Sequence, residues 1–179
     1  VNFNAFNLLS STHLTVQGLA MHGFANVIVG TQNVQSGAGV QVFGNYIGTT
    51  REGNSLGQSG NSGCAVRSGL IPSQVGGVLA WQRNLLSGSA CGVMASSPSV
   101  IEGNLIGTDA SGTLAIPNGT SVNWPGVIIG ARQNVRVGGS VAAARNVISG
   151  NQPWGIGVWP SFGGGGGALE NIVIHGNYI

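Results

Sequence analysis

Residues 99–108 read Ser-Val-Ile-Glu-Gly-Asn-Leu-Ile-Gly-Thr, and similar stretches stand at residues 40–49 and 171–179. In each stretch, two short runs of β-type residues meet at a Gly-Asn corner. A chain that repeats such a unit is most simply a solenoid, because each unit buries its apolar side against the next. The corner therefore predicts one repeating turn along the whole chain.

The length of that turn follows from the glycines that open β-type runs. They recur with spacings of 29, 34 and 29 residues, at Gly63, Gly92, Gly126 and Gly155. A second run that ends in glycine and a third run that begins with asparagine follow each opening. Six turns of about 30 residues, with three runs each, fit residues 1–179. This pattern predicts an all-β fold, a right-handed parallel β-helix, in a single domain whose first turn, residues 1–23, is irregular.

The corner asparagines fall into one column when the turns are stacked. Their side-chain amides would then lie one above the next and bond to one another, as in the ladders of stacked β-structures. Beside them runs a column of corner glycines, where a sharp bend favours a positive φ. The expected structural ladder consists of Asn45, Asn84, Asn104, Asn146 and Asn177, and the glycine column of Gly18, Gly44, Gly77, Gly103, Gly139 and Gly176.

Composition excludes several function classes. Only 6% of the 179 residues are charged, with six Arg, no Lys and four acids, so no basic footprint for nucleic acid exists. The apolar residues form short runs, and none approaches the roughly 18 residues needed to span a bilayer. The chain begins with Val rather than Met, which we interpret as a processed product or a fragment of a longer protein.

The runs Gly-Asn-Tyr-Ile-Gly-Thr (44–49), Gly-Asn-Leu-Ile-Gly-Thr-Asp (103–109) and Arg-Asn-Val-Ile-Ser-Gly-Asn (145–151) resemble the parallel β-helix repeats of large secreted bacterial proteins in the pectate-lyase-like superfamily. The resemblance covers most of the chain from about Gly39 onward. It implies a fold rather than an activity, because that fold carries lyases, hydrolases, adhesins and structural rods.

Catalytic sets of that superfamily have no counterpart in the residues. Its lyases use several carboxylates for calcium and its hydrolases use clustered aspartates, whereas this chain has a single Asp, Asp109. Glu102 lies one run earlier, and convergence of Glu102, Asp109 and arginines in one cleft would favour an enzyme. We expect no catalytic residues, metal or cofactor, and consider an enzyme less favoured than a scaffold.

Weaker signals have structural alternatives. The histidines His13, His22 and His175 lack partners at metal-ligand spacing. Residues 53–57 fit the pattern G-x-S-x-G but lie in a loop without a helix pattern. Asn118 begins a lone glycosylation sequon, and residues 163–167 are five glycines, expected to form a flexible loop.

The two cysteines align in adjacent turns when Ser62–Val66 is set against Ser89–Val93. The distance of one strand spacing permits a disulfide between Cys64 and Cys91, which would suit an extracellular protein. This alignment competes with the one that sets Gly63 level with Gly92. A reduced, buried pair remains the alternative.

The tryptophans are the best hint of a binding surface. Trp124 and Trp154 precede the first runs of consecutive turns, and Trp159 closes one of these runs. With Trp81 they could form an exposed stripe that stacks on sugar rings or packs on another protein. Covering the core beneath loops is the alternative.

Both ends of the chain read as unfinished coil. The sequence stops at Asn177-Tyr178-Ile179, partway through a third run, and residues 1–9 are a β-type run with interspersed asparagines. Solenoid ends without caps expose strand edges. The mean hydropathy of +0.26 favours a surface that packs against another protein. We therefore predict a non-catalytic structural protein, outside the cell or on its surface, whose copies stack head to tail into a filament.

Three alternatives stay open. The chain could be the ordered piece of a longer β-helix, or a carbohydrate-binding or polysaccharide-degrading β-helix with the tryptophans as its platform. Ice binding is weaker, because Thr49 and Thr108 lie a whole turn apart instead of forming a ladder.

Overall fold

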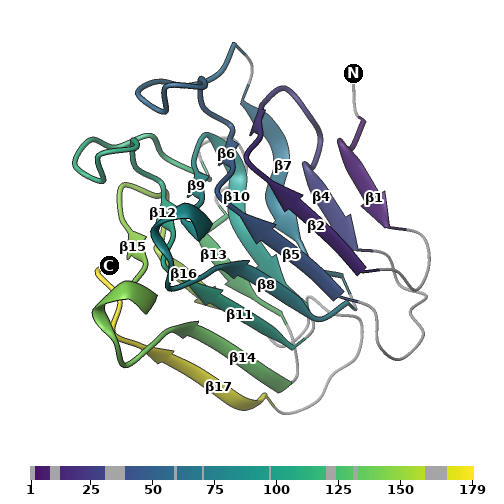
Figure 1. The fold of residues 1–179 in the computed structure, drawn as a ribbon, viewed down its shortest axis with the longest axis vertical. Coiled ribbons are helices and arrows are strands. Elements are labelled where there is room, and N and C mark those ends of the chain that lie inside the picture. Colours follow the sequence, from purple (N-terminus) through teal and green to yellow (C-terminus); the bar gives the residue numbers. More distant parts are fainter. Residues whose placement is uncertain are drawn as a thin grey trace.

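The computed structural model describes residues 3–8, 13–30, 39–58, 60–69, 71–96, 98–119, 124–130, 133–159 and 169–179. They form a right-handed parallel β-helix of about six turns, built from three parallel sheets (Figure 1). The expected fold class is confirmed. The predicted flexible loop at residues 163–167 lies outside the described residues.

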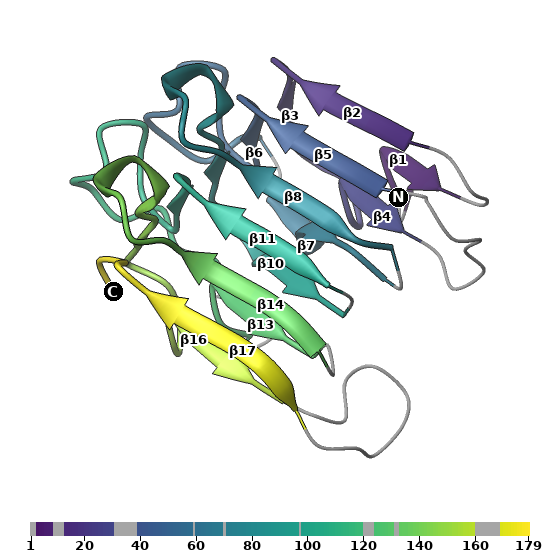
Figure 2. The ribbon, with the colours of Figure 1, turned by 60° about the horizontal axis from the view of Figure 1, so that its bottom comes forward.

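Each of the first five turns contributes one strand to each sheet, and the sixth turn contributes a strand to the first and to the second sheet (Figure 2). The first sheet contains β1 (Phe6–Leu8), β4 (Ile28–Gly30), β7 (Asn61–Arg67), β10 (Ser89–Ala95), β13 (Val127–Ile129) and β16 (Ile156–Val158). The second contains β2 (His13–Gln17), β5 (Gly39–Phe43), β8 (Ser73–Gly76), β11 (Ser99–Glu102), β14 (Gln133–Gly138) and β17 (Glu170–His175). The third contains β3 (Ala20–Met21), β6 (Tyr46–Ile47), β9 (Leu85–Leu86), β12 (Leu105–Ile106) and β15 (Val147–Ile148).

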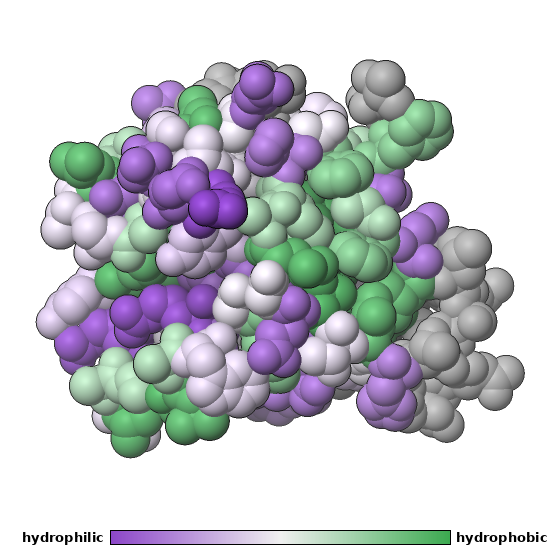
Figure 3. Space-filling view, turned by 45° about the horizontal axis from the view of Figure 1, so that its top comes forward, coloured by the Kyte–Doolittle hydropathy of each residue, from purple (hydrophilic) through white to green (hydrophobic). Residues whose placement is uncertain are grey.

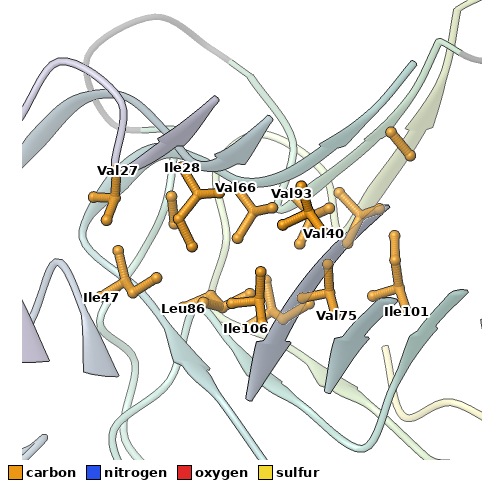
Figure 4. Close-up of a cluster of buried hydrophobic side chains, with 14 of the residues drawn as sticks. Val27, Ile28, Val40, Ile47, Val66, Val75, Leu86, Val93, Ile101 and Ile106 are labelled. Atoms are coloured by element: carbon orange, nitrogen blue, oxygen red, sulfur yellow. The ribbon is translucent and has the colours of Figure 1, made fainter. Parts of the chain in front are cut away.

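The core lies inside the coil. Every second side chain of each strand points into it from all three sheets. In β5, for example, Val40 and Val42 are buried while Gln41 between them is exposed, as the period of two in a strand requires. Residues at the same level of successive turns stack in register. The resulting cluster of Val, Ile and Leu fills the interior (Figure 4).

Glycine corners let the chain turn from the second sheet into the third. Gly44 and Gly103 have φ of 63° and 72°, a region that costs other L-residues about 1–2 kcal/mol. In two turns, however, the positive φ lies at Gly76 and Gly138, one residue earlier than the predicted column. These are the turns whose corners hold an insertion with a 3-10 helix, η1 (Ala80–Gln82) or η2 (Ala142–Ala144).

Each corner insertion is tied to the following turn by an arginine. Arg83 donates from Nε to the carbonyl oxygen of Gly103 at 3.1 Å, and Arg145 does the same to Gly176 at 3.0 Å. An Arg-Asn pair after the insertion thus links two corners at once.

The first sheet corrects one sequence alignment. Cys91 pairs with Cys64 and Val93 with Val66, so Gly92 stands level with Ala65 rather than with Gly63. An irregularity between Ser89 and Cys91 accounts for one residue of this two-residue shift, because β7 has an extra residue there that breaks the ladder locally. Gly92, Gly126 and Gly155 do share a level, since Val93, Val127 and Ile156 stack.

Candidate functional site

The carboxylates of Glu102 and Asp109 do not form a common acidic site. Glu102 ends a strand of the second sheet, and its Oε2 accepts a bond of 2.8 Å from Arg136 Nη2. Asp109 follows β12 of the third sheet and bonds within its own loop. Each acid is held by local partners, so the arrangement supplies no pair for general acid and base chemistry.

Asp109 organises the loop in which it lies. Its Oδ1 accepts the backbone N–H groups of Leu114 and Thr113 at 3.1 and 3.0 Å, and Ser111 donates its hydroxyl at 2.8 Å. These bonds, led by that of Leu114, lower the pKa of the Asp109 carboxyl because they stabilise its charged form. The Asp109 carboxylate is a loop cap.

The other polar motifs are structural as well. Ser55 sits in a loop closed by an antiparallel bridge between Thr49 and Leu56, with no helix after it, and its hydroxyl bonds to Asn54. The context that a nucleophile elbow needs is therefore missing. Within the described ranges, His, Cys, Asp and Glu nowhere gather in groups of three that could hold a metal ion.

The five predicted corner asparagines form a continuous chain of side-chain bonds. From Asn45 to Asn177, each Nδ2 donates to the Oδ1 of the next asparagine, at 3.2, 2.8, 3.0 and 2.8 Å. Each Nδ2 also donates to a backbone carbonyl of the preceding turn, as from Asn104 to Val75 at 2.9 Å. This row is called the amide column below.

A second, shorter polar column was missed in the sequence. Asn61 Nδ2 donates to Ser89 Oγ, the Ser89 N–H donates to Asn118 Oδ1, and Asn118 Nδ2 donates to Asn151 Oδ1. A Ser-Gly pair directly precedes Asn61, Ser89 and Asn151 in the sequence, and this repeated pair is the signal of the second column. Asn118 is completely buried, so a glycan could not be attached to it in the folded chain.

Cys64 and Cys91 are joined by a disulfide that links the third and fourth turns. Both are buried in a small hydrophobic cluster outside the main core, together with Met94 and Ile128. Trp124 and Trp159 pack against this cluster. We call these six residues the outer cluster.

The tryptophans divide between two places. Trp124 and Trp159 are half-buried against the four buried members of the outer cluster. Trp154 is 55% exposed beside Trp159, with ring centroids 6.1 Å apart. Trp81 lies apart from them on η1, where it packs edge to face on Phe43 at 5.8 Å. The predicted stripe is therefore a group of three tryptophans, two of which cover buried residues.

Next to the outer cluster is a pocket of about 290 Å³. Trp124, Met94 and Arg67 line it, with Ser62 and Asn26 at its side. The guanidinium of Arg67 has no ion-pair or hydrogen-bond partner among the described residues. An indole beside an uncompensated cation can hold a ring that carries a negative charge.

A groove of about 430 Å³ crosses the outer face of the second sheet, where strands β2, β5, β8 and β11 begin. Its lining is mostly uncharged, with His13, Gln41, Gln74, Pro98 and Val100 among its residues. The described residues that line it include no carboxylate.

The two ends of the coil combine apolar side chains with open strand edges. At the carboxyl-terminal face, Val173, Ile174 and Ile179 are exposed, and β17 pairs on one side only. At the amino-terminal face Phe6 and Leu14 are half-buried. Figure 3 shows hydrophobic side chains gathered there, over β1, β2 and β4.

Comparisons with known proteins leave the fold and these surfaces as the only guide to function. No family model matches the chain, and neither a curated protein nor a solved structure does. Among the described residues, the structure contains no helix with the length and apolar character needed to cross a membrane.

Proposed function

We propose that this protein is a non-catalytic structural protein, a β-solenoid subunit whose copies stack end to end into a filament or surface fibre. The observation that carries the proposal is the pair of end faces. Each presents open strand edges beside apolar side chains such as Ile174 and Leu14, and such edges are templates for further strands.

Contact between opposite ends is heterologous, because the two surfaces differ, and it repeats without closing. The low charge of the chain, 6% of its residues, keeps electrostatic repulsion between copies small. If the chain is part of a longer protein, further turns of that protein would cover the same faces, and the role of a rod would be unchanged.

We place the protein outside the cell or on its surface. The disulfide between Cys64 and Cys91 supports this location, since such bonds persist in oxidising compartments and are rare in the cytosol. We also propose that the chain belongs to the pectate-lyase-like superfamily, on the support of its three parallel sheets and its Gly-Asn corners.

Sedimentation velocity over a range of concentrations tests the stacking. The average mass should rise from 18.0 kDa without a plateau, since an open contact adds subunits indefinitely. Ile174→Lys should keep the chain monomeric, because it places a charge on the carboxyl-terminal face. Val78→Lys, at a similarly exposed residue on a mid-coil corner, is the matched control and should behave as the unmodified chain. A plateau at twice the monomer mass would contradict open stacking.

Carbohydrate binding is a second candidate, favoured by the pocket beside Trp124 and Arg67. Calorimetric titration with oligogalacturonates and with neutral cello-oligosaccharides would test it. We expect the acidic sugar to bind and Trp124→Ala to abolish the signal, whereas Trp81→Ala should leave it intact, because Trp81 lies on a different corner. Absence of heat with both sugars would reject this function.

A further inference from the structure

We propose that copies of this chain meet in one defined register, which continues the side-chain columns of all three sheets but interrupts the amide column, and that Leu19 weakens the junction at that point. This inference rests on the proposed stacking. In this register, the carboxyl-terminal face of one copy contacts the amino-terminal face of the next.

The corner glycines set the register. Gly176 is level with the corner of the fifth turn, and Gly18 is level with Gly44 of the second. Their φ angles are 72° and 70°, so the same bend occurs at both ends. We therefore place Gly18 of one copy level with Gly176 of the preceding copy. The sixth turn of one copy and the first turn of the next then stack like two consecutive turns within a chain.

In this register the second sheet continues without a break. Ile174 of β17 falls beside Val16 of β2, and Ile172 beside Leu14, at positions that point into the core in every turn. Val173 falls beside Thr15 on the outer face, where both side chains are exposed. The 40% exposure of Ile174 in the single chain would be removed by the contact.

The other two sheets continue in the same way. In the first sheet, Phe6 and Ile156 occupy the same level, as the register of the strands between them shows. Ile156 of β16 therefore contacts Phe6 of β1 in the next copy, one apolar residue against another. Ile179 meets Met21 of β3 through the level that Ile47 and Leu86 occupy. Apolar residues thus extend apolar columns across all three sheets.

The amide column is the exception. Along the chain, each ladder residue donates its backbone N–H to the Oδ1 of the next asparagine, as from Asn146 to Asn177 at 3.2 Å. At the amino-terminal end the corresponding residue is Leu19, whose N–H donates to Asn45 Oδ1 at 3.1 Å. Leu19 of the next copy would therefore face Asn177 without offering it an acceptor. The Nδ2 of Asn177 keeps its bonds to the carbonyls of Val137 and His175, but the backbone N–H of Asn177 would lack the Oδ1 acceptor that each internal ladder residue has. A buried N–H without an acceptor is unfavourable, so the junction is weaker than a contact between two internal turns.

Cysteine cross-linking tests the register. Thr15→Cys and Val173→Cys in one chain should form intermolecular disulfides and a series of covalent oligomers under oxidising conditions, because neighbouring strands lie about 4.8 Å apart. Thr15→Cys with Asn171→Cys is the matched control. Its cysteines are offset by two residues, or about 7 Å along the strand, and should not cross-link.

A substitution at the junction tests the role of Leu19. Leu19→Asn adds an acceptor for Asn177 and a donor for the carbonyl of Ile174 in the preceding copy, by analogy with the bond from Asn45 to Val16 at 2.8 Å. The concentration at which assembly begins should fall about five- to tenfold. Leu19→Gln, with a side chain one carbon longer, should not reproduce this shift.

The outcomes separate the register from the proposed function. Fibres that form without the Thr15–Val173 cross-link, or that Leu19→Asn leaves unchanged, would overturn the register and keep the stacking. Val173→Cys alone should cross-link far less than the pair, and equal cross-linking of the single variant would overturn the register, because the disulfide would then not depend on Thr15→Cys. Neither cross-links nor a rise in mass at any concentration would reject the stacking itself.

Discussion

The side-chain amide of Asn104 bonds in several directions at once. Its Nδ2 donates to Val75, Glu102 and Asn146, and its Oδ1 accepts both the backbone N–H and the Nδ2 of Asn84. Because the site is buried, water cannot replace these partners. One residue therefore holds the corners of three successive turns at a fixed level.

Substitution of Asn104 by Ala should destabilise the chain by about 2–4 kcal/mol, since several buried polar groups lose their partners together. Urea unfolding followed by circular dichroism measures the change. Asn177→Ala is the matched control at the open end of the amide column, where solvent reaches the groups left behind, and we expect a loss below about 1 kcal/mol. Equal losses at the two positions would show that the column does not act as a buried network.

Gly103 illustrates why the corner needs glycine. It has φ of 72°, and a Cβ there would lie 2.2 Å from the carbonyl oxygen of Gly77. Gly112, in the loop of Asp109, has φ of 76° but its nearest neighbour is 3.4 Å away. The two positions share the backbone conformation and differ in the space around it.

The two alanine variants should therefore separate strain from steric overlap. Gly112→Ala should cost about 1 kcal/mol through its backbone conformation alone, whereas Gly103→Ala should cost at least about 2 kcal/mol more, because the backbone of a neighbouring turn must shift. Thermal unfolding of both variants provides the comparison. Similar melting temperatures would contradict the close stacking at this corner.

Asp109 should make stability depend on pH. Its pKa in the folded chain lies below the ordinary value of 3.8, so its contribution is present above about pH 4 and is lost as pH falls through the folded pKa. The difference in unfolding free energy between the unmodified chain and Asp109→Asn should be constant near neutral pH and shrink in acid. A difference that stays unchanged down to about pH 2 would contradict the loop-capping role.

At the scale of elements, the disulfide joins β7 and β10 covalently, in addition to the backbone hydrogen bonds between these two strands. It closes a sequence separation of 27 residues, for which the chain-entropy model gives about 3–4 kcal/mol. Both cysteines are at most 1% exposed beneath Trp124 and Trp159. Reductants therefore have little access to the sulfur atoms in the folded chain.

The double variant Cys64→Ala, Cys91→Ala should lose about 3–4 kcal/mol of unfolding free energy and keep its β-sheet spectrum. In the unmodified chain, thiol labelling after addition of reductant should be slow until denaturant is added. Rapid labelling without denaturant would show that the outer cluster does not shield the bond.

The strands were readable from the sequence because each has a simple local pattern. The alternation of Val40, Gln41 and Val42 marks a half-buried strand, and the Gly-Asn pair after it marks the corner. Once these corners are aligned, the residues that pair between successive turns can be read from the sequence. Such features depend on neighbouring residues in the chain, so no long-range information was needed.

Other features depend on contacts between turns and could not be predicted in this way. The irregularity beside Cys91 shifts one alignment, and the insertions before Asn84 and Asn146 move the positive φ by one residue. The sequence indicated in which turns the tryptophans lie. It did not indicate that Trp124 and Trp159 pack against the disulfide. Burial of Trp124 is decided by packing outside the coil, which a repeat pattern does not encode.

At the scale of the whole molecule, the proposed function rests on the two ends of the coil. The sides of the coil carry a small pocket and a mostly uncharged groove, and the described acids bond to nearby groups. The ends combine open strand edges with apolar residues. We therefore propose that the two end faces carry the function and that Leu19 tunes their contact.

Negative-stain electron microscopy of the purified chain at increasing concentration tests this claim most directly. We expect unbranched fibres about one β-helix wide, which lengthen as the concentration rises because the head-to-tail contact does not close. Only dispersed rods about 30 Å long, the length of six turns at about 4.8 Å each, at every concentration would contradict end-to-end stacking.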